Sequence, residues 1–396
     1  MQRAVRDLVG LRASAMDPRP WLRHGDGGDY PFVRVAGDGV HEIPVGPVHA
    51  GIIEPGHFRF SVVGEKVLRL EQRLGYAHKD IERRFREFDA LEGHRLAARV
   101  SGDSAVAYAW AYCQALEGAS KHEIPPRAAW LRALALELER IENHLGDLGA
   151  LGNDAGFAFG LTQFSRLKEQ VLRASETALG QRYLLDAVAP GGMRVDLSRS
   201  GAAVLADTVT AVAAESIELR SIYDEHAGLR DRFAGAGTVT PELAARLGLT
   251  GLAGRASGQA QDLRIDRPWA PYDRLGPAKC GATGGDVAAR VEQRFEELAE
   301  SCRLVGRILE GLPAGESIAP PPACEDGFGV GLVEGWRGPV LVALSIGEAG
   351  RIRFCHPHDP SWQNWPVLEH AIIGNIVPDF PLINKSFNLS YSGHDL

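Results

Sequence analysis

The residue types that most often bind metals or carry covalent chemistry are sparse in this sequence. Five cysteines stand at positions 113, 280, 302, 324 and 355, and no two of them lie within four residues of each other. This spacing contains no C-x-x-C pair, so it predicts neither a zinc site nor an iron–sulfur site in the chain. Cysteines without a disulfide framework are typical of buried thiols in a reducing compartment, and we expect Cys113 and Cys302 to be buried.

Two histidines have a spacing that could bind a metal. His356 and His358 form a His-x-His pair, whose imidazoles would share one face of a strand. Because the pair directly precedes Asp359-Pro360, we expect it in a polar loop instead. The sequence has neither a G-x-G-x-x-G nor a G-x-x-x-x-G-K-[ST] motif, so we expect no nucleotide site in this chain.

Composition excludes several classes of function. The 396 residues include 43 Lys and Arg against 51 Asp and Glu, which gives a formal net charge of −8. An acidic balance argues against a protein that binds nucleic acid. The N-terminus lacks the uninterrupted apolar stretch of a secretory signal, and no segment has the roughly 18 apolar residues of a spanning helix. We therefore expect any action at a membrane to depend on partner proteins.

The pattern of apolar residues predicts a mainly helical α+β protein with small β-hairpins towards each end. Residues 1–40 are rich in Gly, Asp and Arg, so we expect an irregular leader followed by one domain over 41–396. Hairpins are predicted at 58–63 with 67–70 and at 340–344 with 351–355. Helices are predicted at about 79–92, 101–118, 127–151, 161–179, 200–232 and 286–312.

The predicted helix over 127–151 carries charges beside its apolar stripe. The charged residues are Arg132, Glu137, Glu139, Arg140 and Glu142. Charges opposite an apolar stripe usually face water, so we expect a solvated helix face or a subunit interface here.

Seven short segments are more specific than composition. They are IPVGPVHA (43–50), LGYAHKDIE (74–82), LERIENHL (138–145), PGGMRVD (190–196), RPWAPYDRL (267–275), GDVAAR (285–290) and EGWRG (334–338). In this order they resemble the large subunit of nickel–iron hydrogenases and its relative, the 49-kDa subunit of respiratory complex I. Residues 54–60 and 385–393 look closest to the membrane-bound, energy-converting hydrogenase branch. The resemblance implies a hydrogenase large-subunit-like helical bundle as the core.

The chain departs from the nickel–iron enzymes at their metal ligands. Those enzymes hold the metals with four thiolates in two C-x-x-C pairs, and the matching positions here are Ser101, Ser104, Ser390 and Gly393. A serine hydroxyl is a hard, weak ligand and glycine offers none, so we expect no nickel–iron centre and no bound metal. The resemblance also implies that Leu396 lies near the point where relatives lose a C-terminal extension after metal insertion.

Complex I uses the corresponding cavity for quinone, so the resemblance makes quinone a possible ligand. His49 matches the histidine of the Gly-Pro-x-His segment, while the quinone-binding histidine falls at Ile53, or at His57 if a short insertion is allowed. The quinone tyrosine falls at or beside Ser101 and is absent, although Tyr391 could approach from the C-terminal motif. The candidate cofactor-binding residues are therefore His49, His57, Ser101, Ser104, Ser390, Tyr391 and His394.

Glu82, His49 and Asp103 are the candidates for proton handling. Glu82 matches the glutamate that passes protons in the hydrogenases, and an ion pair with Lys79 or Arg86 fits its spacing equally well. For Asp103 a role beside a substrate is open, but we favour an N-cap of the helix that begins at Ser104.

The last candidates lie at the end of the sequence. His394 and Asp395 could line the cavity, but we favour a tether of the C-terminal segment. A hard-metal site of Glu82, Asp103, His394 and Asp395 is a less supported alternative.

The resemblance implies the metal-free large subunit of a membrane-associated respiratory oxidoreductase, similar to NADH:quinone oxidoreductase or to energy-converting hydrogenases. Electrons would pass from an iron–sulfur cluster in a small partner subunit towards an acceptor such as quinone, coupled to ion translocation by membrane subunits. A 30-kDa-like subunit and a peripheral place on the cytoplasmic side of the inner membrane are also expected. The alternative is a non-catalytic coupling subunit. An open tunnel lined by Tyr391, His49 and apolar residues favours the first function, and a filled site favours the second.

Overall fold

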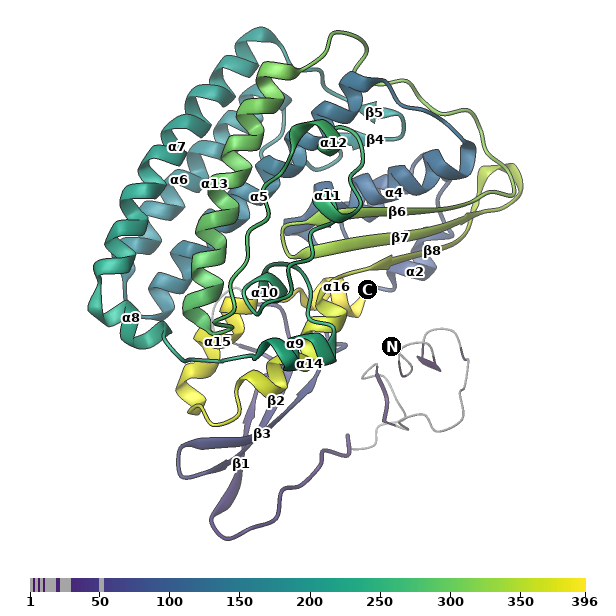
Figure 1. Cartoon of the computed structure of the whole chain (residues 1–396). Helices are drawn as coiled ribbons and strands as arrows, with labels where there is room; N and C mark the ends of the chain where they lie inside the picture. Colours follow the sequence, from purple (N-terminus) through teal and green to yellow (C-terminus); the bar gives the residue numbers. More distant parts are fainter. Residues whose placement is uncertain (1–2, 4–5, 8–9, 11–18, 22–29, 50–52) are drawn as a thin grey trace.

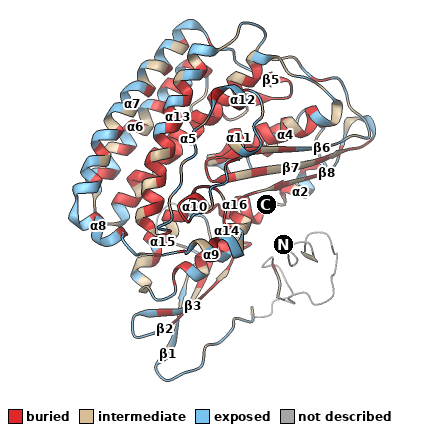
Figure 2. Cartoon of the chain, in the orientation of Figure 1, coloured by how far each residue is buried: buried red, intermediate tan, exposed pale blue. Residues whose placement is uncertain are grey.

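The computed structural model describes residues 3, 6–7, 10, 19–21, 30–49 and 53–396. Its largest part is a bundle of four long helices (Figure 1), which are α5 (Pro126–Asp154), α6 (Ala158–Leu179), α7 (Arg199–Glu225) and α13 (Val287–Gly311). Helix α5 packs against α6 and α13, and α7 packs against the same two helices. Figure 2 shows α5 buried along most of its length, whereas α6 and α7 keep exposed outer faces. Helix α5 therefore lies on the buried side of the bundle.

A three-stranded antiparallel sheet lies beside the bundle. Its strands are β6 (Phe328–Gly335), β7 (Gly338–Ile346) and β8 (Ile352–His358), in that order. Helix α4 (Ala105–Ser120) crosses β6 and β7. The approach is close because β6 has glycine where the helix touches it: a Cβ on Gly331 would lie 1.8 Å from the Ala111 carbonyl oxygen.

A second antiparallel sheet projects from the far end of the molecule (Figure 1) and consists of β1 (Val40–Val45), β2 (His57–Val63) and β3 (Lys66–Arg73). The short strands β4 (Val188–Ala189) and β5 (Gly192–Met193) pair with each other. The remaining helices are α2 (Ile81–Phe85), α3 (His94–Ala97), α8 (Ala227–Phe233), α9 (Pro241–Leu247), α10 (Gly251–Arg255), α11 (Leu263–Asp266), α12 (Tyr272–Leu275), α14 (Ser361–Ala371), α15 (Phe380–Phe387) and α16 (Tyr391–Asp395), with 3-10 turns η1 (Gly102–Ser104), η2 (Glu348–Gly350) and η3 (Val377–Asp379).

The predicted mainly helical α+β class is confirmed, and so are both hairpins and the buried Cys113 and Cys302. Each hairpin has a third strand, β1 or β6, that the pattern did not reveal. The helix predicted at 79–92 shortens to α2, and the one at 200–232 divides at His226, whose ring accepts a hydrogen bond from the Leu229 amide and starts α8. The chain beyond Asp359, for which the sequence pattern predicted no helix, forms α14, α15 and α16.

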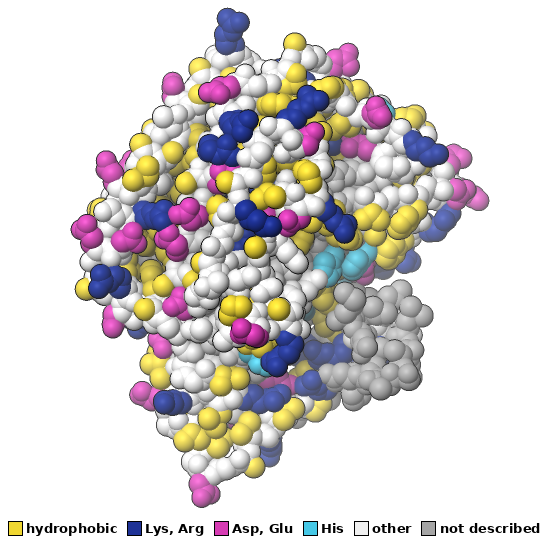
Figure 3. Space-filling view, viewed as in Figure 1, with side chains coloured by type: hydrophobic (Ala, Val, Ile, Leu, Met, Phe, Trp, Pro, Cys, Tyr) yellow, Lys and Arg dark blue, Asp and Glu magenta, His cyan; other side chains and the backbone are white. Residues whose placement is uncertain are grey.

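Much of the predicted leader lies outside the described residues. Within its described part, Trp21 is buried and stacks on Trp362, with ring centroids 5.5 Å apart. None of the helices in the described ranges is long and apolar enough to cross a bilayer. On the face drawn in Figure 3, basic and acidic side chains are interspersed.

Candidate functional site

The two segments that carry the expected serines meet in the folded chain. Ser101 and Ser390 are 289 residues apart in sequence, yet their hydroxyl oxygens lie 2.8 Å apart in the interior. Ser101 precedes η1 and Ser390 is the N-cap of α16, where its oxygen accepts the Gly393 amide at 2.9 Å. Ser101 donates to Asp103 Oδ1 at 2.9 Å, so the hydrogen at the shared contact comes from Ser390. The hydroxyls therefore satisfy each other.

The other two positions matched to metal ligands are also occupied by protein contacts. Ser104 accepts a hydrogen bond from the Arg337 guanidinium at 3.3 Å. At Gly393 a Cβ would lie 2.5 Å from Asp359 Oδ2 and 2.9 Å from Ser390 Oγ. Real side chains do not come that close, so the backbone fold leaves no room for a larger residue at 393.

Asp103 and Arg337 form the ionic centre of the site. The guanidinium binds both carboxylate oxygens, with Nη1 2.7 Å from Oδ1, and the backbone oxygen of Asp103 accepts from Trp336 Nε1 at 2.7 Å and from Asn143 Nδ2 at 2.9 Å. Burial favours the neutral acid, but the Arg337 charge outweighs it and holds the pKa of Asp103 below its ordinary value. The expected N-cap role is wrong, because Ser104 occupies the N-cap position of α4 and the Asp103 carboxylate turns to Arg337 instead.

A pocket of about 500 Å³ opens beside this ion pair. Its wall is largely polar, with acids and bases from α5, α6 and the C-terminal helices. The lining residues are Ile53, Glu54, Asp103, Asn143, Gly146, Asp147, Asp154, Lys168, Arg337, Pro381, Asn384, Lys385, Asn388, Leu389 and Tyr391. Tyr391 is the aromatic member, and burial raises its pKa to about 12, so its hydroxyl is a neutral hydrogen-bond donor at ordinary pH.

His49 and His57 do not line this pocket. His49 Nε2 donates to the Gly56 carbonyl at 2.8 Å, and His57 Nδ1 donates to the Gly46 carbonyl at 3.2 Å. Together they tie the two ends of the 46–57 loop, in which residues 50–52 lie outside the described residues. Burial lowers the pKa of His57, so this ring is held neutral. Of the two positions considered for the quinone-binding histidine, Ile53 lies in the pocket wall and His57 does not.

Glu82 has a different partner from those expected. Its carboxylate lies 2.6 Å from His356 Nδ1, while the Lys79 ammonium donates to the Arg99 and Val100 carbonyls at 3.0 and 2.8 Å. The predicted Lys79 or Arg86 pairing is therefore wrong. The prediction that the His-x-His pair lies in a loop is also wrong, because His356 and His358 both belong to strand β8.

The tether predicted for the C-terminal segment is confirmed. Asp395 Oδ2 accepts the Ala77 amide at 2.9 Å, its other oxygen contacts His394 Nδ1 at 2.8 Å, and the His78 ring donates to its carbonyl at 2.8 Å. Glu82, Asp103 and Asp395 thus face separate partners. Across the described ranges, no three His, Cys, Asp or Glu side chains cluster as metal ligands would.

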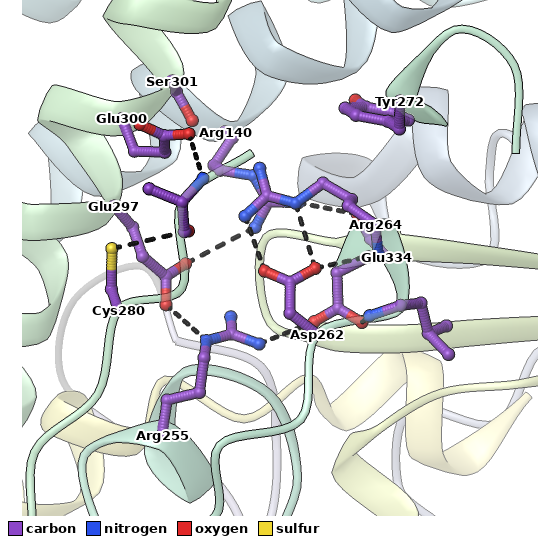
Figure 4. Close-up of polar contacts among 12 residues, drawn as sticks. Arg140, Arg255, Asp262, Arg264, Tyr272, Cys280, Glu297, Glu300, Ser301 and Glu334 are labelled. Atoms are coloured by element: carbon purple, nitrogen blue, oxygen red, sulfur yellow. Dashed lines mark hydrogen bonds and ion pairs between the residues drawn. The ribbon is translucent and has the colours of Figure 1, made fainter. Parts of the chain in front are cut away.

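The prediction of a solvated face on α5 is wrong. Arg132, Glu137, Glu139, Arg140 and Glu142 are all buried. Figure 4 shows the network around Arg140, Arg255, Asp262, Arg264, Glu297 and Glu334, which lies between α13, β6 and the loops that bear α10 and α11. Glu137 completes it, accepting hydrogen bonds from Tyr272 and Ser301 at 2.6 Å each and from Arg264 at 3.0 Å. The distant partners of these charges could not be identified from periodicity.

Comparisons with known proteins identify relatives of the chain. A family model described as "Respiratory-chain NADH dehydrogenase, 49 Kd subunit" matches residues 154–325. The chain is 30% identical over 402 residues to formate hydrogenlyase subunit 5 of Escherichia coli (strain K12), covering 98% of this chain and 69% of that protein. It is 27% identical over 315 residues to a subunit of the NADH-quinone oxidoreductase of Bacteroides thetaiotaomicron, covering 79% of this chain and 59% of that protein.

A solved structure shares the fold. It is titled as the membrane-bound sulfane sulfur reductase, an archaeal respiratory membrane complex, and one of its chains superposes with a TM-score of 0.84 at 23% identity, covering 90% of this chain and 98% of that chain. The chain therefore belongs to the family that joins hydrogenase large subunits, such as formate hydrogenlyase subunit 5, to the 49-kDa subunit of respiratory-chain NADH dehydrogenase.

Proposed function

We propose that the chain is the metal-free large subunit of a membrane-bound respiratory oxidoreductase, and that the pocket beside Asp103 and Tyr391 receives the electron acceptor. A small partner subunit would supply electrons from its iron–sulfur cluster. A 30-kDa-like subunit and ion-translocating membrane subunits would complete the assembly, with this chain peripheral on the cytoplasmic side. The names of the relatives support this assignment, since they include an NADH-quinone oxidoreductase subunit and a membrane-bound hydrogenase subunit.

The observation that carries the proposal is the direct contact between Ser101 and Ser390 beside the Asp103–Arg337 ion pair. Nickel and iron in this family require soft thiolates, and here three of the four matching positions hold serine hydroxyls that bond to protein groups, while the fourth is Gly393. A reaction at this place must therefore use the adjoining pocket and not a metal between the serines.

The pocket can hold a flat, polar acceptor such as a quinone headgroup. Ile53, Leu389 and Pro381 offer apolar contact, and the Tyr391 hydroxyl can donate to a carbonyl oxygen. The cations Lys168 and Lys385 on the same wall would stabilise negative charge that develops when the acceptor is reduced. Proton donors are needed as well, because a two-electron quinone reduction takes up two protons.

A second function is favoured by the same serine contact. If the acceptor pocket stays empty, the filled metal position suits a coupling subunit that passes a partner's redox change to the membrane subunits by conformation. The two functions differ in whether the pocket binds an acceptor.

The test uses the chain purified with its iron–sulfur partner. We expect iron at cluster stoichiometry without nickel, and we expect a quinone analogue to bind with at least tenfold weaker affinity in Tyr391→Leu. Ile217→Ala, on the exposed face of α7, is the matched control and should bind as the parent does. Iron without analogue binding would favour the coupling subunit, and stoichiometric nickel would overturn the metal-free assignment.

A further inference from the structure

Two buried acids on α5, Glu139 and Glu142, lack the arginine partners that the other buried acids of that helix, Glu137 and Asp147, have. Their exposed fractions are 4% and 6%, so both are buried. Within the described part of the chain, neither carboxylate forms an ion pair with a Lys, Arg or His side chain. A buried, unpaired carboxylate is costly when charged, so its burial favours the protonated form.

Glu139 lies directly behind the candidate site. Its two oxygens accept the Val106 and Ala107 amides at 2.6 and 3.2 Å, in the first turn of α4 and just after the Ser101–Ser104 segment. Asn143, which donates to the Asp103 carbonyl at 2.9 Å, also donates to the Glu139 carbonyl at 2.8 Å. The backbone amides stabilise a charge on Glu139, while burial raises the pKa of this carboxyl well above its ordinary value.

Glu142 lies one helical turn further along and has an unsatisfied atom. Its Oε2 is buried and has no hydrogen-bond partner. It borders a recess that is too narrow to hold a water molecule, together with Glu139, Ser175, Arg182, Tyr183 and Leu184. Burial raises the pKa of Glu142 to about 7, so it can gain and lose a proton at ordinary pH.

The charges around Glu142 influence whether it is ionised. On α6 and the loop after it, Lys168 and Arg182 favour an ionised Glu142, and Asp103 on η1 disfavours it. Arg182 is held by Glu169 at 2.6 Å. Lys168 lies over Gly146 and lines the candidate pocket, so it connects the surroundings of Glu142 with the site.

We propose that Glu142 and Glu139 are a proton-loading pair that supplies the candidate pocket, with protons taken up at the surface beside Tyr183, which is exposed. A carboxylate of the pair takes a proton from water and becomes a neutral acid. When the acceptor in the pocket gains electrons from the partner's iron–sulfur cluster, the O–H bond breaks, the proton goes to the reduced acceptor and the carboxylate re-forms. Proton binding belongs to this chain alone, whereas its use in the reaction rests on the proposed function.

The first experiment measures proton binding without any turnover. Infrared spectra of the full chain between pH 5 and 9 should contain a carbonyl band of a protonated carboxylic acid that titrates near pH 7. Glu142→Gln should remove the part of that transition that belongs to Glu142. Glu369→Gln is the matched control, because burial raises the pKa of Glu369 to about 7 as well and this residue does not line the candidate pocket; its loss should leave the Glu142 part of the transition in place. A titration that is identical in the parent and in Glu142→Gln would overturn the proposal.

The second experiment uses the complex with its iron–sulfur partner. Glu142→Gln should slow acceptor reduction at least tenfold and remove the pH dependence near 7, and Glu142→Asp should restore most of the rate. An unchanged rate and pH profile in Glu142→Gln would overturn the role in proton supply. If the parent complex reduces no acceptor but its chain shows the Glu142 transition, the proposed function fails and the proton-binding pair is supported.

Discussion

Helix α5 places the same residue type in two different environments. Glu137 faces α13 and α12, where Arg264, Tyr272 and Ser301 satisfy its oxygens. Glu139 accepts hydrogen bonds from backbone amides of α4, whereas the buried Oε2 of Glu142 has no hydrogen-bond partner among the described residues. The pKa of Glu137 is lowered, since nearby guanidinium charges outweigh its burial, and that of Glu142 is raised. Equal burial thus produces a permanent charge on one side and a titrating group on the other.

The difference separates structural acids from acids suited to proton transfer. An ion pair with several donors keeps its charge at any ordinary pH and stabilises the local arrangement only while it is complete. An unpaired acid reduces stability when ionised, but it can exchange a proton. On α5, Glu139 contacts the first turn of α4, just after the Ser101–Ser104 segment, whereas Glu137 faces residues of α11 and α12.

The largest loss of stability is expected for a substitution of Glu137, the ion-paired acid of α5. Glu137→Gln would leave Arg264 without a carboxylate partner at this position and would place an amide against the Tyr272 and Ser301 hydroxyls. Breaking a buried ionic network by removing one member costs roughly 3–5 kcal/mol. Chemical denaturation of the purified chain measures it, and a loss below about 1 kcal/mol would contradict the paired arrangement.

The unpaired side should produce a pH-dependent stability. The folded pKa of Glu142, about 7, exceeds the ordinary value of 4.5, so the folded chain binds more protons than the unfolded chain between these pH values. The free energy of unfolding therefore falls as pH rises through this window, by about 3 kcal/mol for this one group. Glu142→Gln should lose that slope and exceed the parent in stability at pH 8. Denaturation curves at pH 5 and pH 8 measure this difference in the free energy of unfolding. The same pH dependence in the parent and in Glu142→Gln would show that Glu142 does not titrate in this range.

At the site itself the comparison can be sharpened with Arg337→Lys. The substitution keeps the positive charge but loses the fork that binds both Asp103 oxygens and reaches Ser104. We expect a loss of about 2 kcal/mol in unfolding free energy, together with a rise in the Asp103 pKa. Denaturation and carboxyl infrared titration are the measurements. A variant as stable as the parent would show that a positive charge at position 337 stabilises Asp103 without the two-pronged guanidinium contact.

The smallest effect is expected for Ser101→Ala. It removes one hydroxyl between Asp103 and Ser390, and a buried hydrogen bond contributes about 1 kcal/mol. Because neither serine titrates, the loss should be the same at pH 5 and pH 8. A stability loss that varied between pH 5 and pH 8 would show that the hydrogen bonds of Ser101 are coupled to a titrating group such as Glu142.

Much of the architecture could be predicted from local pattern. The stripes of α5, α6 and α13, the Gly180 that ends α6 in a left-handed conformation and the Asp286 that caps α13 at the Ala289 amide all act over a few residues. The third strands β1 and β6 were missed, since pairing depends on a partner elsewhere in the chain. The solvated face expected on α5 failed for the same reason: its charges are satisfied by residues far away in the sequence, such as Arg264, which is 127 positions from Glu137.

By itself the sequence determined the family resemblance and the residue types at the matched positions. Serine and glycine stand at the positions that we match to thiolates, and ordered motifs mark the segments of the candidate site, because ligand softness and motif order are properties of residue type and position. Only the tertiary structure decided what those residues do. It joins Ser101 to Ser390, gives Asp103 to Arg337, draws His49 away from the pocket and leaves Glu142 unpaired. The physical reason is that the charge state and hydrogen bonding of a buried group depend on neighbours brought together by packing over long sequence distances.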